Sequence, residues 1–292
     1  MKYQIYYHEI NDYIRIEKMI GQSPVVVVPS HINEKEVKEI GKYCFSKDVD
    51  YTKYQHTNQI ENGTTLSLNY IEEVILPSTI QSIQACAFYN CKNLRKIKCE
   101  STIELASDVF MNCTSLTEIE VPSFNEAKPL LKQISWSVLV KCAQGSLFFP
   151  EYYEVYNEIG PAHIFGINIE GEGYRMRQSF DSSGFRIDEY DQCFNKLSVE
   201  EKEEVVCKVV YYRMLIESKE IYETYLLQHQ KTFSKLLTKD TIDYFSSYLD
   251  IETLDFIIER ATKLKDSEFV TKCIAIKRKK HKKKTYDFED FI

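Results

Sequence analysis

The sequence predicts an α+β protein in which a short solenoid of repeated coils fills the first half and an all-α domain the second. Two observations predict this division. Short motifs recur at a constant spacing between residues 24 and 123, and beyond residue 150 apolar residues follow helical spacing instead. A chain of 292 residues is long enough for two domains.

The repeat is clearest in two ten-residue segments, 88–97 and 110–119. Five of their ten positions are identical at a spacing of 22, and residues 78–80 (STI) return at 101–103. An earlier copy is indicated where VPS and IGKYCF follow the start and middle of the same unit, within residues 28–45. A coil that returns every 22 to 23 residues gives one short strand per turn and stacks on its neighbours.

Each repeated residue type has an expected structural role. Leu94 and Ile97 should form inward ladders with their counterparts one coil later, and Phe88 an aromatic spine along the convex side. Asn90 and Asn112 are expected to bond the backbone of their own and the next coil. Several of the nine cysteines fall at equivalent positions and none forms a Cys-x-x-Cys pair, so we expect reduced structural thiols.

The repeat pattern Ile-x-x-x-Ala-Phe-x-Asn-Cys-x-x-Leu-x-x-Ile, followed by an apolar residue and Pro-Ser, resembles the BspA-like class of leucine-rich repeats. The resemblance covers residues 24–47 and 71–123. It implies a short leucine-rich-repeat solenoid of about four coils over residues 1–150. Members of this family include secreted surface adhesins as well as cytosolic proteins, so the resemblance implies binding more firmly than it implies location.

Two parts of the first 150 residues depart from the repeat. Residues 48–70 are either a degenerate coil or an insertion, in which Asn62-Gly63 predicts a hairpin turn. An insertion is a candidate contact site, whereas a tolerated surface loop is the simpler interpretation. Residues 1–23 alternate apolar and polar side chains, which predicts a strand or hairpin that caps the first coil.

The second half is expected to hold a junction over residues 151–185 and an all-α helical-hairpin domain over residues 186–292. Pro150 and the residues after it predict a helix start, and Ser198 to Glu201 read as a capping box. Further helices are predicted at residues 218–229, 231–237, 241–249, 251–264 and 267–281, with Asp240, Asp250 and Asp266 as amino-terminal caps. This region is loosely similar to ankyrin-like helical hairpins and looks like an accessory helical domain that follows BspA-like repeats in some uncharacterised bacterial proteins.

The junction contains the stretch of sequence that most resembles a binding site. Two glycines would expose backbone amides in a tight turn, and two arginines would clamp a carboxylate or phosphate. An enzyme site here is one hypothesis; the simpler one is a domain junction, with the tyrosine packed inward and the arginines bonding carbonyls or acidic side chains. The candidate partner or anion contacts are Gly171, Gly173, Tyr174, Arg175, Arg177 and Gln178.

A basic stretch near the carboxyl end contrasts with the net charge of −7. It predicts either a nucleic-acid-binding or regulatory adaptor, or a solvated terminal helix whose cations favour its carboxyl end. The acidic body argues against extended phosphate contact. The residues of this candidate patch are Lys277, Arg278, Lys279, Lys280, Lys282, Lys283 and Lys284.

No catalytic motif emerges, because the six histidines are scattered without metal spacing and no nucleophile motif is present. We therefore expect no catalytic residues, no metal and no cofactor. The amino terminus does not read as a signal sequence and no apolar run is long enough for a bilayer. The sequence predicts a cytoplasmic bacterial protein that is not an enzyme, does not enter membranes, and presents its repeats to a protein partner.

Overall fold

A computed structural model describes residues 3–46, 50–57, 63–66, 69–159 and 164–286. The chain divides into two compact units, Met1–Glu200 and Glu201–Ile292. The division falls later than the expected start of the helical domain at residue 186. The reason is that α3 (Ile187–Gln192) and α4 (Phe194–Glu200) belong, like α2 (Gly173–Arg177), to the unit that contains the solenoid.

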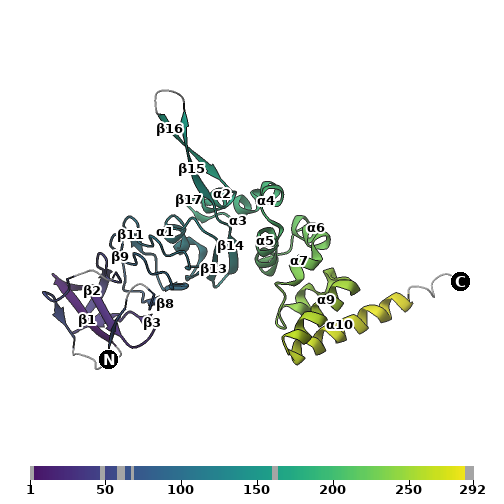
Figure 1. Cartoon of the computed structure of the whole chain (residues 1–292), viewed down its shortest axis with the longest axis horizontal. Helices are drawn as coiled ribbons and strands as arrows, with labels where there is room; N and C mark the ends of the chain where they lie inside the picture. The colour runs from purple at the N-terminus through teal and green to yellow at the C-terminus, as the bar shows by residue number, and fades with distance from the viewer. Residues whose placement is uncertain (1–2, 47–49, 58–62, 67–68, 160–163, 287–292) are drawn as a thin grey trace. The chain divides into compact units, whose positions relative to one another are not determined.

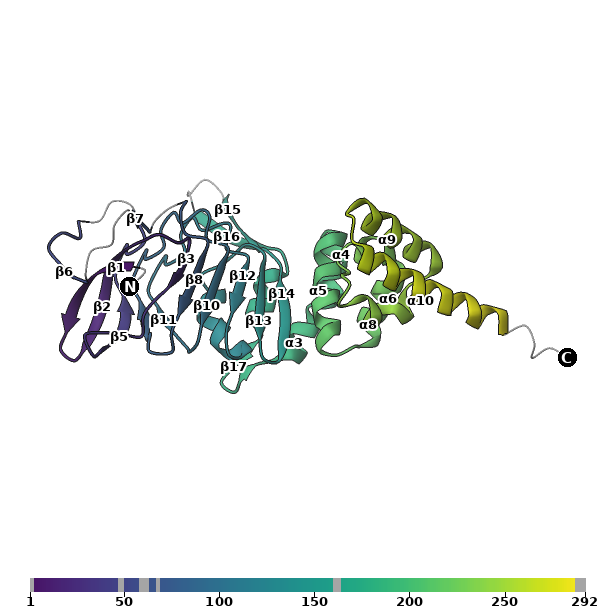
Figure 2. The same ribbon diagram turned by 90° about the horizontal axis from the view of Figure 1, so that it is seen from below.

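A six-stranded sheet runs along one side of the solenoid. Its order is β14-β13-β12-β10-β8-β3, and all neighbours are parallel except β13 and β14. Figure 2 shows these strands side by side. Their inward residues are in register and fully buried: Val26, Val74, Ile97, Ile119 and Val140. The strands are β3 (Val25–Val27), β8 (Glu73–Leu76), β10 (Lys96–Cys99), β12 (Glu118–Glu120), β13 (Val138–Cys142) and β14 (Gly145–Phe149).

A second sheet contains the amino-terminal cap. Residues 3–21 form the antiparallel hairpin that the alternating pattern predicts, and its second strand pairs in parallel with the first coil. The sheet order is β11-β9-β5-β2-β1-β6, with β4 on β5 and β7 on β2. The strands are β1 (Tyr3–Ile10), β2 (Tyr13–Gly21), β4 (His31–Ile32), β5 (Lys35–Ile40), β6 (Gln55–His56), β7 (Thr64–Thr65), β9 (Ser82–Ile83) and β11 (Glu104–Leu105).

The predicted aromatic spine is confirmed and extends to Phe45. The ring centroids of Phe45 and Phe88 lie 4.7 Å apart, and those of Phe88 and Phe110 lie 5.5 Å apart, each pair stacked and buried. The Cys113 thiol donates to the Phe88 carbonyl at 2.9 Å, and the Cys91 thiol to the Phe45 carbonyl at 3.6 Å. These thiols therefore have the structural role predicted for them, because they link successive coils.

The stacking of Phe45 on Phe88 shows whether residues 48–70 form a coil of the solenoid or an insertion between two coils. The two coils are direct neighbours, since β5 pairs with β9 and the Phe45 amide donates to the Ala87 carbonyl at 2.9 Å. No coil lies between them, so the segment is an insertion and not a degenerate coil. Its strands β6 and β7 pair with the cap strands β1 and β2. The predicted Asn62-Gly63 turn includes residue 62, which lies outside the described residues.

The repeated asparagines act differently from the expectation. Asn90 and Asn112 have φ of 61° and 64°, a left-handed conformation that Asn tolerates better than most residues. The Asn112 side-chain amide donates to the Asn90 side-chain oxygen at 2.8 Å. The two side chains thus bond each other across coils. The main requirement at this position is therefore the sharp turn. The sequence-based expectation named a side-chain bond to the backbone and did not include this turn.

A tyrosine hydroxyl closes each end of the six-stranded sheet. Tyr3 donates to the carbonyl of Val25 at 2.8 Å and accepts from the amide of Val27 at 3.2 Å, both on the terminal strand β3. At the other end Tyr190 donates to the Phe148 carbonyl on β14 at 2.6 Å. Because open strand edges template aggregation, these contacts protect the solenoid.

Tyr3→Phe is expected to lower the free energy of unfolding by about 0.5–1.5 kcal/mol, the usual net contribution of a hydrogen bond. The ring remains, so packing is conserved while the β3 carbonyl and amide lose their partner. Urea denaturation measures the loss, and light scattering should show faster aggregation. Tyr190→Phe should behave alike at the other end; an unchanged unfolding midpoint for both variants would refute this role.

The predicted helix start after Pro150 is wrong. Residues 153–159 form β15 (Tyr153–Ile159), which pairs antiparallel with β16 (Ile164–Glu170) in a ribbon. The segment YEVYNEI is rich in residues that favour strands, and this preference outweighs the proline signal. Other elements at this end are η1 (Phe124–Ala127), α1 (Lys128–Leu131), β17 (Phe180–Asp181) and β18 (Gly184–Phe185).

The second unit is all-α, as predicted. Aromatic rings fill its core, with Phe245 centroids 5.0 Å from Phe233 and 5.4 Å from Tyr211. Asp250 caps its helix as predicted, because its carboxylate accepts from the Thr253 amide at 2.7 Å. The helices are α5 (Glu203–Ile216), α6 (Glu220–Gln228), α7 (Gln230–Ser234), α8 (Ile242–Phe245), η2 (Ser246–Tyr248), α9 (Ile251–Lys263) and α10 (Ser267–Tyr286).

Two of the predicted helix caps in this region are wrong. Ser198 lies inside α4, where its hydroxyl donates to the Asn195 carbonyl at 2.9 Å, so the predicted capping box does not start a helix. Asp240 does not begin α8 either, because Thr241 occupies the position before its first residue. Asp266, in contrast, accepts from the Phe269 amide at 3.0 Å at the start of α10.

Candidate protein-interaction surface

The solvent face of the six-stranded sheet, hereafter the sheet face, presents aligned rows of side chains. Successive residues of a strand point to opposite sides, so the residues between the buried ones face outward. Glu73, Lys96 and Glu118 lie side by side in one row, and Ile75, Lys98 and Glu120 in the next. The outward rows therefore alternate in charge across the central coils.

Ion pairs connect these rows into a continuous lattice. The Lys96 ammonium lies 2.8 Å from Glu120, 3.2 Å from Glu118 and 3.7 Å from Glu73. Lys98 bridges to Glu120 at 2.8 Å, and Lys141 on β13 to Glu118 at 2.7 Å. The three lysines and three glutamates of the lattice cancel in net charge. The lattice therefore presents a fixed pattern of charges without net attraction for ions of one sign.

The lattice changes the protonation of its members. Hydrogen bonds from Lys96 and Lys98 lower the pKa of Glu120 to about 2. The hydrogen bond to Glu120 in turn raises the pKa of Lys96. A carboxylate with a lowered pKa in the folded state stabilises the protein above its ordinary pKa and loses that contribution as the pH falls toward about 2.

Lys96→Met is expected to lower the free energy of unfolding at pH 7. Below pH 5 the free energy of unfolding of the variant should depend less on pH than that of the parent. The variant leaves the glutamates without their central cation, and protonation then relieves their repulsion. The effect should stay below about 1 kcal/mol because the pairs are partly exposed. Urea titrations at pH 7, 5 and 3 measure it. A difference between variant and parent that grows toward pH 3 would contradict the lattice.

Apolar side chains extend the sheet face beyond the lattice. Val25 and Val27 on β3 are 38% and 48% exposed, and Ile75 beside Val27 is partly exposed. At the carboxyl ends of β10, β12 and β13 lies a pocket of about 410 Å³, with Lys98, Glu120 and Lys141 among its lining residues. The sheet face thus combines an apolar patch, a fixed charge pattern and a concavity.

The junction residues named from the sequence do not converge on an anion. Arg177 is buried, and its guanidinium donates to the carbonyls of Pro150, Gly173 (2.8 Å) and Trp136 (2.7 Å). Burial lowers the pKa of Arg177 to about 10. Arg175 is exposed and lies 3.6 Å from the buried Glu172. The two arginines therefore contact different groups.

The remaining junction residues contribute to packing. A Cβ atom on Gly173 would lie 2.1 Å from the Pro150 carbonyl oxygen, so only glycine fits there. Tyr174 is half-buried and packs on Tyr152 with ring centroids 5.3 Å apart. Gly171 adopts φ of 97° before α2, and the exposed Gln178 ends that helix. The structure thus places these residues where the last strand of the solenoid meets α2.

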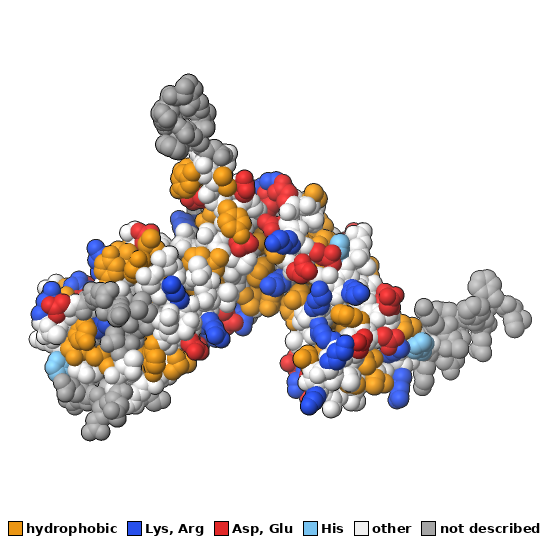
Figure 3. All heavy atoms as spheres, in the orientation of Figure 1, with side chains coloured by type: hydrophobic (Ala, Val, Ile, Leu, Met, Phe, Trp, Pro, Cys, Tyr) orange, Lys and Arg blue, Asp and Glu red, His pale blue; other side chains and the backbone are white. Residues whose placement is uncertain are grey.

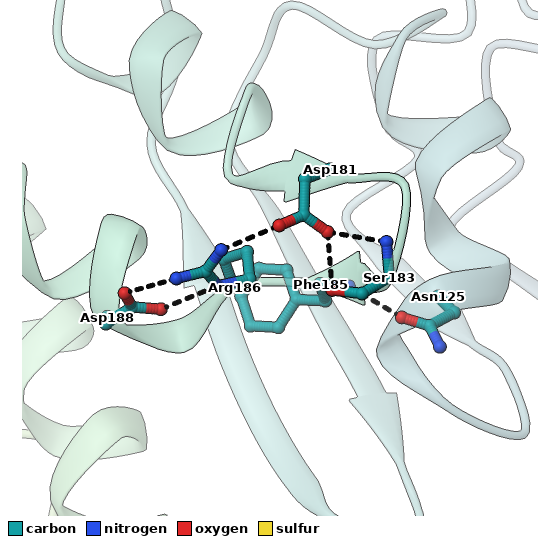
Figure 4. Close-up of polar contacts among 6 residues, drawn as sticks. All are labelled: Asn125, Asp181, Ser183, Phe185, Arg186 and Asp188. Atoms are coloured by element: carbon teal, nitrogen blue, oxygen red, sulfur yellow. Dashed lines mark hydrogen bonds and ion pairs between the residues drawn. The ribbon is translucent and has the colours of Figure 1, made fainter.

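Sequence reasoning missed a cluster of polar contacts at the carboxyl end of this junction (Figure 4). The side-chain oxygen of Asn125 accepts from the Phe185 amide at 2.7 Å, and a Cβ on Gly184, whose φ is 121°, would lie 2.4 Å from that oxygen. Arg186 bridges Asp181 at 2.6 Å and Asp188 at 2.8 Å. The run DSSG at 181–184 is a turn signal that could have predicted the hairpin of β17 and β18.

The basic stretch lies on α10. Lys277 pairs with Asp255 of α9, and Lys280 donates to the Ser247 carbonyl at 3.4 Å. Arg278 and Lys279 are exposed. The side chains of Lys282, Lys283 and Lys284 are outside the described set, so the patch as a whole stays a prediction.

The described residues also bear on two other classes of site. No three His, Cys, Asp or Glu side chains among them are grouped as metal ligands. No helix formed by these residues combines the length and the apolar character needed to cross a membrane.

The stacked coils define the first unit as a leucine-rich-repeat solenoid. Residues 38–158 match the BspA type leucine rich repeat region in six copies. The resemblance seen in the sequence is thereby confirmed. The copies extend past residue 123, where η1 and α1 replace the Phe-x-Asn-Cys turn and obscure the pattern of the last coils.

Other comparisons add little. No curated protein matches the chain. Among solved structures, a leucine rich cell surface protein from Faecalibacterium prausnitzii is similar, with 21% identity and a TM-score of 0.29. The match covers 44% of this chain and 33% of that one. The chain thus spans about a third of the length of that protein.

Proposed function

We propose that the protein is a non-enzymatic interaction module that binds a partner protein on the sheet face. The observation that carries this proposal is the position of an exposed valine patch directly beside a charge lattice on one in-register surface. Repeats of this class support a role in protein interaction. An apolar centre with polar neighbours is the common composition of protein interfaces.

The physical design of the sheet face favours binding. Strand pairing fixes the backbone of the sheet face and ion pairs hold its charged side chains, so less conformational entropy is lost when a partner docks. The fixed alternation of lysine and glutamate would select partners by complementary charge, which gives specificity more than affinity. Tyr3 occupies the backbone edge of β3, so a partner would contact the side chains of Val25 and Val27 rather than extend the sheet.

We also propose a cytoplasmic location. All nine cysteines are free, and seven of them are buried. Two of the buried thiols, those of Cys91 and Cys113, form contacts between coils that a disulfide would break. Such use of cysteine suits a reducing compartment.

The two other functions considered from the sequence gain no specific support. The enzyme hypothesis at residues 171–178 relied on two convergent arginines, and Arg177 instead serves three carbonyls. The nucleic-acid hypothesis rests on Arg278, Lys279 and their neighbours on a chain of net charge −7. We therefore propose neither.

Photocrosslinking tests the proposal. A photoreactive amino acid is placed at Val27 or Lys98 on the sheet face, and at Met111 in a turn away from it, where the side chain is 48% exposed. Irradiation in the native host should crosslink one and the same protein to positions 27 and 98, and that protein, once purified, should bind the parent chain. Equal crosslinking from position 111 would contradict a binding surface on the sheet face.

A further inference from the structure

The β15–β16 ribbon exposes several large apolar side chains. It projects from the solenoid (Figure 1), and each strand pairs only with the other in the described part of the chain. Tyr153, Tyr156, Ile167 and Ile169 are 56%, 63%, 57% and 42% exposed. Figure 3 shows hydrophobic side chains along the ribbon. A two-stranded ribbon is marginally stable in water, and apolar surface of this kind marks an interaction site.

The register assigns these side chains to faces. Tyr156 is opposite Ile167, and Glu154 is opposite Ile169, so one face carries the two isoleucines together with Tyr156 and Glu154. Along β16 the residues from 167 to 170 read Ile-Asn-Ile-Glu. Over these four residues the strand therefore alternates between apolar and polar side chains. An added strand would have to alternate in the same way to match it.

The charge of the ribbon selects among possible occupants. Residues 151–174 contain five glutamates and no lysine or arginine. Glu172 already has Lys196 at 2.6 Å, whereas Glu154 and Glu170 are exposed on the ribbon. Two copies of the ribbon would bring like charges together, which opposes pairing, while a basic partner would be attracted.

We propose that the outer edge of β16 accepts an extended segment of a partner protein in which apolar and basic residues alternate. The segment adds a third strand by main-chain hydrogen bonds. Its apolar residues cover Ile167 and Ile169, and its basic residues lie beside Glu170 on the other face. This site is separate from the sheet face, and its occupation would give the ribbon the third strand that independent stability requires.

Synthetic peptides provide the test. Isothermal titration of the full chain uses three ten-residue peptides: alternating Val-Lys, alternating Val-Glu, and a block peptide with the composition of the first. The alternating basic peptide should bind on the order of tenfold more tightly than either other peptide, because only it matches both the pleat and the charge. A rise in salt should weaken this binding.

Variants locate the binding. The double variant Ile167→Ser with Ile169→Ser should weaken the alternating basic peptide on the order of tenfold, and Glu170→Lys should weaken it while sparing the apolar face. The matched control, Val25→Ser with Val27→Ser on the sheet face, should bind the peptide like the parent. Circular dichroism confirms that each variant is folded, and Glu170→Lys keeps the test decisive should the double variant unfold.

Three outcomes would overturn the proposal. These are similar affinities for the basic and acidic alternating peptides, basic-peptide binding that both ribbon variants retain, and a dimer of the parent chain that the double isoleucine variant abolishes. The last outcome would assign the ribbon to a second copy. None of them bears on the crosslinks expected at Val27 and Lys98, which probe a different surface.

Discussion

Phe88→Ala is expected to lower the free energy of unfolding by about 3–5 kcal/mol, the cost of removing a buried aromatic ring. Phe88 is fully buried between Phe45 and Phe110, with centroid distances of 4.7 and 5.5 Å. Neither neighbour can move into the space without breaking the register of its own coil. Each coil is stabilised mainly by its neighbours. The loss should therefore also make the coils before Phe88 unfold separately from the coils after it.

Urea denaturation followed by circular dichroism measures this effect. Met111→Ala is the matched control, because that side chain is 48% exposed in the turn that follows Phe110. It should change the free energy of unfolding by less than about 0.5 kcal/mol. A loss below about 1 kcal/mol for Phe88→Ala would mean that the spine does not hold the coils together.

Arg177→Ala is expected to destabilise the protein by about 2–4 kcal/mol. The substitution leaves the carbonyls of Pro150, Gly173 and Trp136 buried without their donor. Removal of a buried charge recovers some desolvation cost, which the lowered pKa of Arg177 reflects, but it does not replace the lost hydrogen bonds. The end of the solenoid should therefore detach from α2 at lower denaturant concentration.

Arg175→Ala serves as the control because this side chain is 59% exposed, and the stability should change by less than about 0.5 kcal/mol. Thermal unfolding with and without inorganic phosphate separates the two interpretations of the junction. The structural role predicts the same loss for Arg177→Ala in both conditions. A phosphate-dependent stabilisation of the parent that both arginine variants abolish would instead restore the anion site.

The repeat could be predicted because its residues act through their neighbours in adjacent coils. Phe88, Cys91 and Leu94 are buried in each coil for the same reason, so sequence identity at a spacing of 22 reported their contacts directly. The insertion at 48–70 could not be distinguished from a coil, since the spacing of 43 between Phe45 and Phe88 is close to two repeats. The stacking of those rings and the direct pairing of β5 with β9 decided it.

The junction was beyond sequence reasoning because its contacts are distant in the chain. The partners of Arg177 include carbonyls of residues 136 and 150, and Asn125 bonds an amide 60 residues away. The charge lattice, in contrast, left a signal. Glu73, Lys96 and Glu118 occupy equivalent positions at spacings of 23 and 22 with alternating sign. A comparison of the outward positions between coils would have identified it.

The binding role of the sheet face is tested most directly by the affinity of the crosslinked partner, once purified, for two variants of the full chain. Val27→Asp places an unpaired charge in the exposed valine patch, and Met111→Asp places the same charge in an equally exposed turn away from it. We predict that calorimetry shows at least about tenfold weaker binding for Val27→Asp and an unchanged affinity for Met111→Asp. Parent-like affinity for Val27→Asp, in a variant with parent-like stability, would contradict the proposed interaction surface.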